Sequence, residues 1–157
     1  MMGKIDINNL SEQIVILGAR IYPLFRQVFR DYHPDEIAVL HILRARGGEL
    51  ERRELIKALD IDPRIVSKRV RDLLSKGLVD TYRSSASARE SIDRITKKGN
   101  REFEDIRNKM KLLLKQGFTF VDKEKQKVLE SIVDQANANI GLIANVIKQV
   151  AQISVRR

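Results

Sequence analysis

DPRIVSKRVRDLLSKG, residues 62–77, is the stretch that decides the fold of this 157-residue chain. Asp62 is a good helix N-cap, and Pro63 suits the first helical position. Apolar residues then recur at helical spacing and predict a buried stripe: Val66, Val70, Leu73 and Leu74. Gly77 marks the end of the helix. The stretch therefore predicts a short amphipathic helix whose other faces meet solvent.

Beyond Gly77 the pattern changes from that of a helix to that of a β-hairpin. Residues 78–83 and 91–95 predict two short strands, which the small, polar residues 84–89 join. The sequence therefore places a hairpin, or wing, directly after the helix that begins near residue 62.

Two more helices precede this unit. Pro34 opens one of them at its first position, with acidic residues next to it, and Gly47 and Gly48 end it. A shorter helix covers about residues 52–59. Residues 34–99 therefore predict a winged helix-turn-helix module.

The N-terminal part of the chain, residues 1–33, predicts one amphipathic helix. Asn9 can cap it, and Pro23 removes a helical hydrogen bond, so we expect a kink there. Its apolar positions step by three and four: Leu10, Ile14, Leu17, Ile21, Phe25 and Val28.

The C-terminal part, residues 100–157, predicts two helices. Thr96 caps the first, which runs to Gly117, and a last long helix starts near Asp122. The apolar positions of the last helix are in near-heptad order: Leu129, Ile132, Ala136, Ile140, Ile143, Ile147 and Val150. Because long helices flank a small module at both ends, we favour burial between two copies of the chain over burial within one. The fold class predicted is mainly α with a small β-hairpin wing and N- and C-terminal dimerisation helices.

The charge of the chain favours polyanionic partners. It has 30 Lys and Arg against 21 Asp and Glu, a net charge of +9, which suits nucleic acid or an anionic membrane surface. Residues 63–98 hold ten bases against four acids, so the excess is concentrated in the predicted basic helix and wing.

Several function classes have no support. The chain has no cysteine, which excludes disulfides and thiol chemistry. His33 and His41 have no carboxylate pair at ligand spacing, and no glycine-rich phosphate loop is present. We therefore expect no enzyme activity, no cofactor and no metal. Neither a signal peptide nor a long apolar run is present, so we expect no membrane partner and a cytoplasmic, nucleoid-associated protein.

The residues opposite the buried stripe are candidates for contact with DNA. If the stripe faces the core, four side chains point away from it: Arg64, Ser67, Lys68 and Arg71. Arg and Lys can reach guanine O6 and N7 in the major groove, and Ser can contact a phosphate or a base edge. Such a cluster alone is often only a solvated face, but its place on the first turns of a short helix favours DNA. Ile65 borders this face, and either it packs against the preceding helix, which we favour, or it touches a thymine methyl group.

The predicted wing supplies a second candidate contact. Arg83 lies at its base and Arg89 just past its tip, where a guanidinium can enter a neighbouring minor groove. A small loop with one arginine is common on protein surfaces, so the signal depends on the basic helix before it.

The sequence resembles the MarR family of winged-helix transcription regulators over nearly its whole length. The resemblance is carried by ELIKAL at residues 54–59, DPRIVSKRV at 62–70, LLSKGLV at 73–79 and ITKKG at 95–99. It implies that Ser67 and Lys68 occupy the main base- and phosphate-contacting positions, and that Arg89 is the wing-tip arginine. The family usually has an aspartate two residues before that arginine, where this chain has Ser87.

The resemblance also implies a homodimer built from the terminal helices. Two recognition helices would then lie roughly 34–36 Å apart and read a pseudo-palindrome in double-stranded DNA. Many relatives bind small aromatic anions between the arms and the module and then release DNA. Phe25, Phe29 and Tyr32 are candidates to line such a pocket, although an aromatic pair at helical spacing is more often core.

The sequence therefore predicts a sequence-specific, dimeric transcription regulator that can respond to a ligand. The alternative is a sequence-tolerant architectural or chromatin protein, which would use the same basic module without regulating a gene. A protein-interaction module would have apolar residues where Arg64, Lys68 and Arg71 stand, so the sequence argues against it.

Overall fold

The computed structural model describes residues 6–86 and 89–155. Its elements are, in chain order, α1 (Ile7–Val28), α2 (Pro34–Ala45), β1 (Glu49–Glu51), α3 (Arg52–Leu59), α4 (Pro63–Ser75), β2 (Val79–Arg83), β3 (Ser91–Ile95), α5 (Lys97–Gly117), α6 (Lys123–Ala138) and α7 (Ile140–Val155). The predicted fold class, mainly α with a small β wing, is confirmed.

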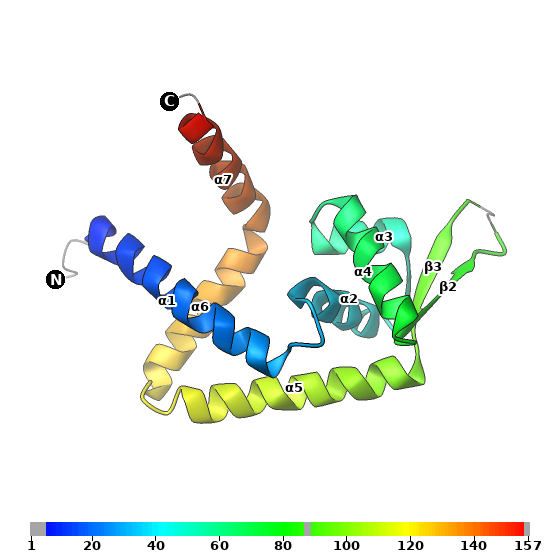
Figure 1. Ribbon diagram of the computed structural model, residues 1–157, viewed down its shortest axis with the longest axis horizontal. Coiled ribbons are helices and arrows are strands. Elements are labelled where there is room, and N and C mark those ends of the chain that lie inside the picture. Colours follow the sequence, from blue (N-terminus) through cyan, green and yellow to red (C-terminus); the bar gives the residue numbers. More distant parts are fainter. Residues whose placement is uncertain (1–5, 87–88, 156–157) are drawn as a thin grey trace.

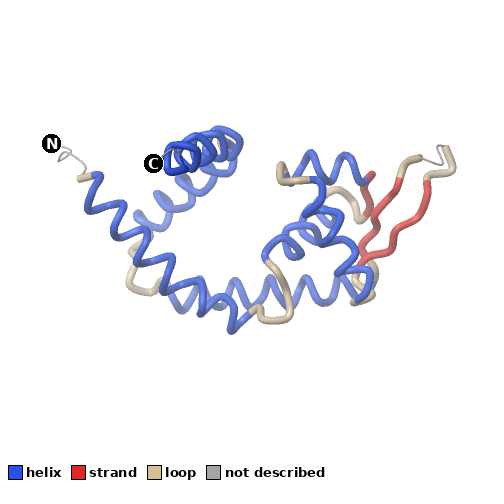
Figure 2. The backbone as a smooth tube through the Cα atoms, turned by 45° about the horizontal axis from the view of Figure 1, so that its top comes forward, coloured by secondary structure: helices blue, strands red, loops and turns tan. Residues whose placement is uncertain are grey.

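The long helix α5 separates the molecule into two ends. The helices α2, α3 and α4 and the strands gather at its start, whereas α1, α6 and α7 lie toward its other end (Figure 1). The second view agrees, with the start of α1 and the end of α7 on one side and the strands on the other (Figure 2). The wing therefore lies far from the start of α1 and the end of α7.

The hydrophobic core lies in the winged helix module and along the start of α5. Its buried members are Val39, Leu40, Leu43, Leu55, Val66, Val70, Leu73, Leu78, Val79, Ile95 and Phe103. Neither α1 nor α6 has a buried residue. The module therefore has its own core, while the helices at the other end leave their apolar side chains exposed.

The junction between α4 and α5 depends on Gly99. A Cβ atom there would lie 2.1 Å from the carbonyl oxygen of Leu78, so a glycine is needed for α5 to begin so close to β2. The backbone N–H of Gly99 donates to Thr96 Oγ1 at 2.9 Å, which confirms Thr96 as the N-cap. Thr96 Oγ1 donates in turn to the Gly77 carbonyl at 2.8 Å.

The sheet has one strand that the sequence pattern does not reveal. It is antiparallel with the order β1-β3-β2, and β1 pairs with β3 from Glu49 opposite Arg94 to Glu51 opposite Ile92. A strand of three residues is too short to show a period of two. The hairpin β2–β3 has Val79 opposite Ile95.

Two expectations about the terminal helices are wrong. Asp6, and not Asn9, caps α1, because Asp6 Oδ1 accepts the backbone N–H of Asn9 at 3.1 Å. The last long helix is two helices, since Asn139 ends α6. The side-chain amide of Asn139 donates to the Gln135 carbonyl at 2.8 Å, and the backbone carbonyl of Asn139 accepts the Ile143 N–H of α7. Asparagine favours such breaks because its amide competes with backbone hydrogen bonds.

Leu74 does not belong to the buried stripe of α4. It is 37% exposed, whereas Val66, Val70 and Leu73 are fully buried. Each residue turns a helix by about 100°, so Leu74 lies well to one side of Leu73. Among the described residues, no helix has both the length and the apolarity needed to cross a bilayer.

Candidate nucleic-acid interface

The helix α4 presents three cations opposite its buried face. Arg64, Lys68 and Arg71 are exposed, and Arg64 has 93% of its side chain accessible. We call these three residues the basic face. Ser67, which the sequence placed with them, is half-buried at its edge. The structure thus brings the predicted recognition-helix residues together on one side of α4.

Asp62 fixes the start of α4 and holds Arg64 loosely. Asp62 Oδ1 accepts the backbone N–H of Arg64 at 2.8 Å, which lowers the pKa of the Asp62 carboxyl. The guanidinium of Arg64 is farther away, with Nε and Nη2 each 3.5 Å from an Asp62 oxygen. Such long contacts at an exposed site add little stability, so the guanidinium is available to another anion.

The other two cations of this segment face away from the basic face. Arg69 lies between two acids, with its Nε 3.4 Å from Asp35 and its Nη1 3.3 Å from Asp72. Lys76, just past the end of α4, pairs with Glu36 of α2. The cations of this segment therefore have two roles. Those of the basic face are exposed to solvent, whereas Arg69 and Lys76 pair with acids where α4 meets α2.

The wing carries the other two predicted DNA-binding residues. Arg83 ends β2, where its Cα is opposite that of Ser91, and Arg89 is exposed just before β3. The backbone N–H of Ser84 donates to the Glu90 carbonyl at 3.0 Å and continues the hairpin. Ser87 lies outside the described residues. Arg83 and Arg89 belong to the hairpin and not to α4, so they are not part of the basic face. The wing itself projects away from α5 (Figure 1).

A buried ion pair that the sequence analysis missed joins the base of the wing to α3. Asp93 of β3 is 0% exposed and accepts from Arg52 at two oxygens, including Arg52 Nη2 to Oδ1 at 2.7 Å. Thr81 Oγ1 donates to Asp93 Oδ1 at 2.7 Å. An acid at an inward strand position is a signal that a partner is needed. The sequence does not say that the partner is Arg52.

Ile65 is exposed, contrary to the packing that the sequence favoured. It is 41% accessible, while the next residue, Val66, is fully buried. Ile65 therefore places an apolar side chain beside the basic face.

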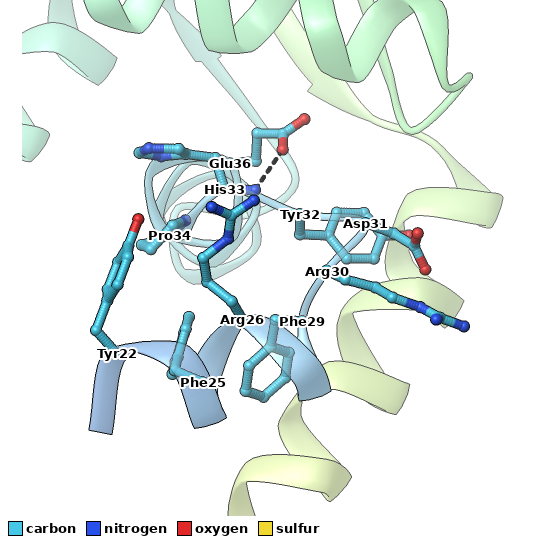
Figure 3. A pocket seen from close by; sticks show the side chains of 10 residues that line it. All are labelled: Tyr22, Phe25, Arg26, Phe29, Arg30, Asp31, Tyr32, His33, Pro34 and Glu36. Carbon is cyan, nitrogen blue, oxygen red and sulfur yellow. Dashed lines mark hydrogen bonds between the residues drawn. The ribbon is translucent and has the colours of Figure 1, made fainter. Parts of the chain in front are cut away.

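The three aromatic residues proposed for a ligand pocket do line one cavity. Phe25 and Phe29 come from α1, with ring centroids 4.7 Å apart, and Tyr32 follows in the connection to α2. The cavity has a volume of about 310 Å³. Arg26 projects from α1 toward the start of α2 (Figure 3). We call this cavity the aromatic pocket.

A carboxylate links the aromatic pocket to α4. Glu36, which lines the pocket, is 3% exposed and accepts the His33 N–H at 2.6 Å (Figure 3). Lys76 Nζ donates to Glu36 Oε1 at 2.7 Å and lies 4.8 Å from the centre of the Tyr32 ring. Lys76, the residue that follows the last residue of α4, therefore connects the aromatic pocket to that helix.

Tyr32 joins the same network to α5. Its hydroxyl donates to Glu102 Oε2 at 2.8 Å. Burial raises the pKa of Tyr32 above its ordinary value, and the hydrogen bond to Glu102 raises it further. The hydroxyl therefore stays protonated as a donor, and the pocket wall is tied to both the module and α5.

The terminal helices expose rows of apolar side chains. On α1 these include Ile7, Leu10, Ile14, Leu17 and Ile21, and on α6 and α7 Leu129, Ile132, Ile140, Ile143, Ile147 and Val150. Aliphatic surface of this extent is unusual for a solvated monomer.

The comparisons with known proteins agree with this geometry. Residues 33–99 match a family described as a winged helix DNA-binding domain. A comparison with curated protein sequences gives no match.

Several solved structures share the fold of the whole chain. The PcaV transcriptional regulator from Streptomyces coelicolor, solved with its natural ligand, has a TM-score of 0.70 at 19% identity and covers 86% of this chain and 96% of its own. BpsR from Bordetella bronchiseptica, whose DNA binding is regulated by 6-hydroxynicotinic acid, has a TM-score of 0.66 at 16% identity, covering 81% and 97%. A mutant MarR from E. coli has a TM-score of 0.62 at 18% identity, covering 85% and 98%. The resemblance to the MarR family is therefore confirmed at the level of the fold.

Proposed function

We propose that this chain, a winged helix DNA-binding protein with the fold of the MarR-type regulators, is a sequence-specific transcription regulator that acts as a homodimer on double-stranded DNA. The observation that carries the proposal is the basic face. Within the described part of the chain, Lys68 and Arg71 make no ion pair, so both are available to phosphates and guanine edges. Their position on the first turns of α4 suits entry into the major groove.

The wing adds a second contact in this proposal. Arg83 and Arg89 would follow the DNA backbone from the major groove to the neighbouring minor groove. The buried pair of Asp93 and Arg52 supports this role, because it fixes the base of the wing relative to α3.

The exposed apolar rows on α1, α6 and α7 support a homodimer. Because these rows are exposed to water in the single chain, a second copy packed against them would bury them. Two basic faces would then lie roughly 34–36 Å apart, one helical turn of DNA, which requires a pseudo-palindromic site.

The aromatic pocket supports control by a small aromatic anion. It lies between α1 and the start of α2, so an occupant would touch both an arm and the module. The aromatic rings offer an apolar wall, and Arg26 offers a cation for a carboxylate. PcaV and BpsR, which share the fold, respectively bind a ligand and respond to 6-hydroxynicotinic acid.

Selection of bound DNA from a random pool at two salt concentrations tests the regulator against the architectural alternative. A regulator should enrich a pseudo-palindrome with half-sites about 10 bp apart and keep a specificity ratio of at least about 10³ at the higher salt. Enrichment of no sequence, with binding that salt abolishes uniformly, would support the architectural protein instead.

The effector is tested separately on the selected DNA. Benzoate, salicylate and 6-hydroxynicotinate serve as aromatic anions, and cyclohexanecarboxylate serves as a non-aromatic anion. Release of DNA by an aromatic anion from the wild type, but not from Phe25→Ala or Arg26→Ala, would assign the response to the pocket. Release that is unchanged in both variants would place the effector elsewhere.

A further inference from the structure

Ile65 is an apolar side chain at a position where the fold does not use it. It stands in the first turn of α4, directly after Arg64 and one turn before Lys68 and Arg69. Its side chain is 41% exposed, although Val66 beside it is completely buried. Within the described residues the core therefore includes Val66, whereas Ile65 stays partly exposed to water.

Helix geometry places Ile65 on the border of the basic face. Each residue turns the helix by about 100°, so Ile65 lies about 60° around the axis from Lys68. It is about 100° from Arg64 and from Val66, on opposite sides. A helix that enters the major groove with Arg64 and Lys68 would therefore bring Ile65 against the base edges on one flank.

The major groove offers one apolar group to such a side chain. Thymine carries a C5 methyl group there, whereas cytosine has no methyl and the purines present only hydrogen-bonding atoms at N7, O6 and N6. The cations of the basic face, next to Ile65, supply attraction to DNA of any sequence, but an aliphatic side chain gains only where it meets a methyl group.

We infer that Ile65 is a specificity-determining residue, which contacts a thymine methyl group and makes each half-site prefer thymine at one position. This inference rests on the proposed function and deepens it. The side chain of Ile65 has no hydrogen-bonding group, so it can contribute only by discriminating thymine from cytosine at the position that it contacts. A protein partner fits the site poorly, because a single aliphatic side chain among cations offers no apolar patch.

The chain offers a matched control in Leu74. It is also a partly exposed aliphatic residue of α4, with 37% accessibility. It lies nine residues further on, about 13 Å along the helix axis, at the end of α4 that meets Lys76. If Ile65 acts through the groove and not through general apolarity, Leu74→Ala should leave base preference unchanged.

The experiment uses deoxyuridine, which is thymine without its methyl group. DNA selected by the wild-type chain is resynthesised with each thymine of one half-site replaced in turn, and affinities are measured by fluorescence anisotropy. The wild type and Leu74→Ala should lose about fourfold at one position, the factor that burial of one methyl group is worth. Ile65→Ala should bind the DNA with thymine and the DNA with deoxyuridine at that position equally. When DNA is selected from a random pool by Ile65→Ala, the preference for thymine at that position should disappear. Circular dichroism checks that Ile65→Ala is folded.

The outcomes separate the inference from the function beneath it. If the wild type selects a site but no deoxyuridine replacement weakens binding, the inference is overturned and the proposed function stands. The same holds if Ile65→Ala retains the wild-type loss at every thymine. If the wild type selects no sequence at any salt concentration, the proposed function fails and the inference fails with it.

Discussion

Lys76, at the end of α4, places its Nζ 2.7 Å from Oε1 of Glu36, a carboxylate that the start of α2 buries almost completely. Lys76 Nζ also donates to the Asp31 carbonyl at 2.7 Å. One ammonium group therefore holds the basic helix, the start of α2 and the connection from α1 together.

Replacing Lys76 should destabilise the protein. Lys76→Met leaves the Glu36 carboxylate buried without its cation, which should lower the free energy of unfolding by about 1–3 kcal/mol. Urea denaturation measures the change. Lys97→Met, at an exposed lysine of α5, is the control and should have little effect. Adding Glu36→Gln to Lys76→Met should recover part of the loss, because a neutral amide costs less to bury. Equal stability of Lys76→Met and wild type would contradict this account.

Removing a cation of the basic face should weaken specific binding without affecting the fold. Arg64→Ala and Lys68→Ala should each cost about 1–3 kcal/mol of binding to the selected site. Lys109→Ala, an exposed lysine of α5, should change affinity much less. Anisotropy titrations at constant salt measure the losses. Wild-type affinity in both basic-face variants would show that another surface contacts the bases.

The wing arginine should contribute chiefly through phosphate and minor-groove charge. Arg89→Ala should weaken binding and reduce the slope of log K against log salt by about 1 for each wing on the DNA. Titrations at four or more salt concentrations give the slope. A slope equal to that of wild type would mean that the wing stays off the DNA.

A charge in the apolar row of α7 should separate the dimer. Ile143 is 38% exposed in the single chain, and a carboxylate there would have to be buried between two copies. Ile143→Asp should sediment as a monomer, and Gln149→Asp, on the same helix, should remain dimeric. If Ile143→Asp is folded and still dimeric, the interface lies elsewhere.

The N-cap of α4 predicts a pH dependence of stability. The backbone N–H of Arg64 lowers the pKa of Asp62, so the ionised cap stabilises the folded state. This stabilisation is complete above the unfolded pKa of about 3.9 and is lost as pH falls through the lower folded value. Asp62→Asn keeps a cap that does not titrate. The difference in Tm between wild type and Asp62→Asn should therefore be constant near pH 6 and shrink below about pH 4. A difference that is constant down to pH 2.5 would contradict the assignment.

Local sequence signals predicted the elements whose ends they mark. Pro63 and Gly77 bracket α4, and Thr96 begins α5, as expected from capping and turn preferences. The position of Arg64, Lys68 and Arg71 followed from helical period alone, because a fully buried stripe fixes the opposite face.

Features that depend on distant residues were not predictable in the same way. The pairing of Arg52 with Asp93 joins residues far apart in the sequence, and Lys76 with Glu36 does the same. Ile65 shows the limit of pattern alone. An isoleucine beside a buried stripe is as apolar as a core residue, so the sequence pattern favours its burial. Whether it is buried depends on how the neighbouring helices pack, and here it is exposed.

The helix α5 is long enough to convert a small tilt at one end into a large displacement at the other. Its 21 residues span about 31 Å as one uninterrupted helix between the end of the molecule that carries the wing and the end that carries α6 and α7. A tilt of about 10° at one end would displace the other by about 5 Å, well over the 3.4 Å rise of one base pair. A tilt of α5 too small to disturb the core would then change the separation of the two basic faces in a dimer, so that it no longer matches one helical turn of DNA. Release of DNA would then be controlled by the angle of α5, with no change in the side chains that contact the bases.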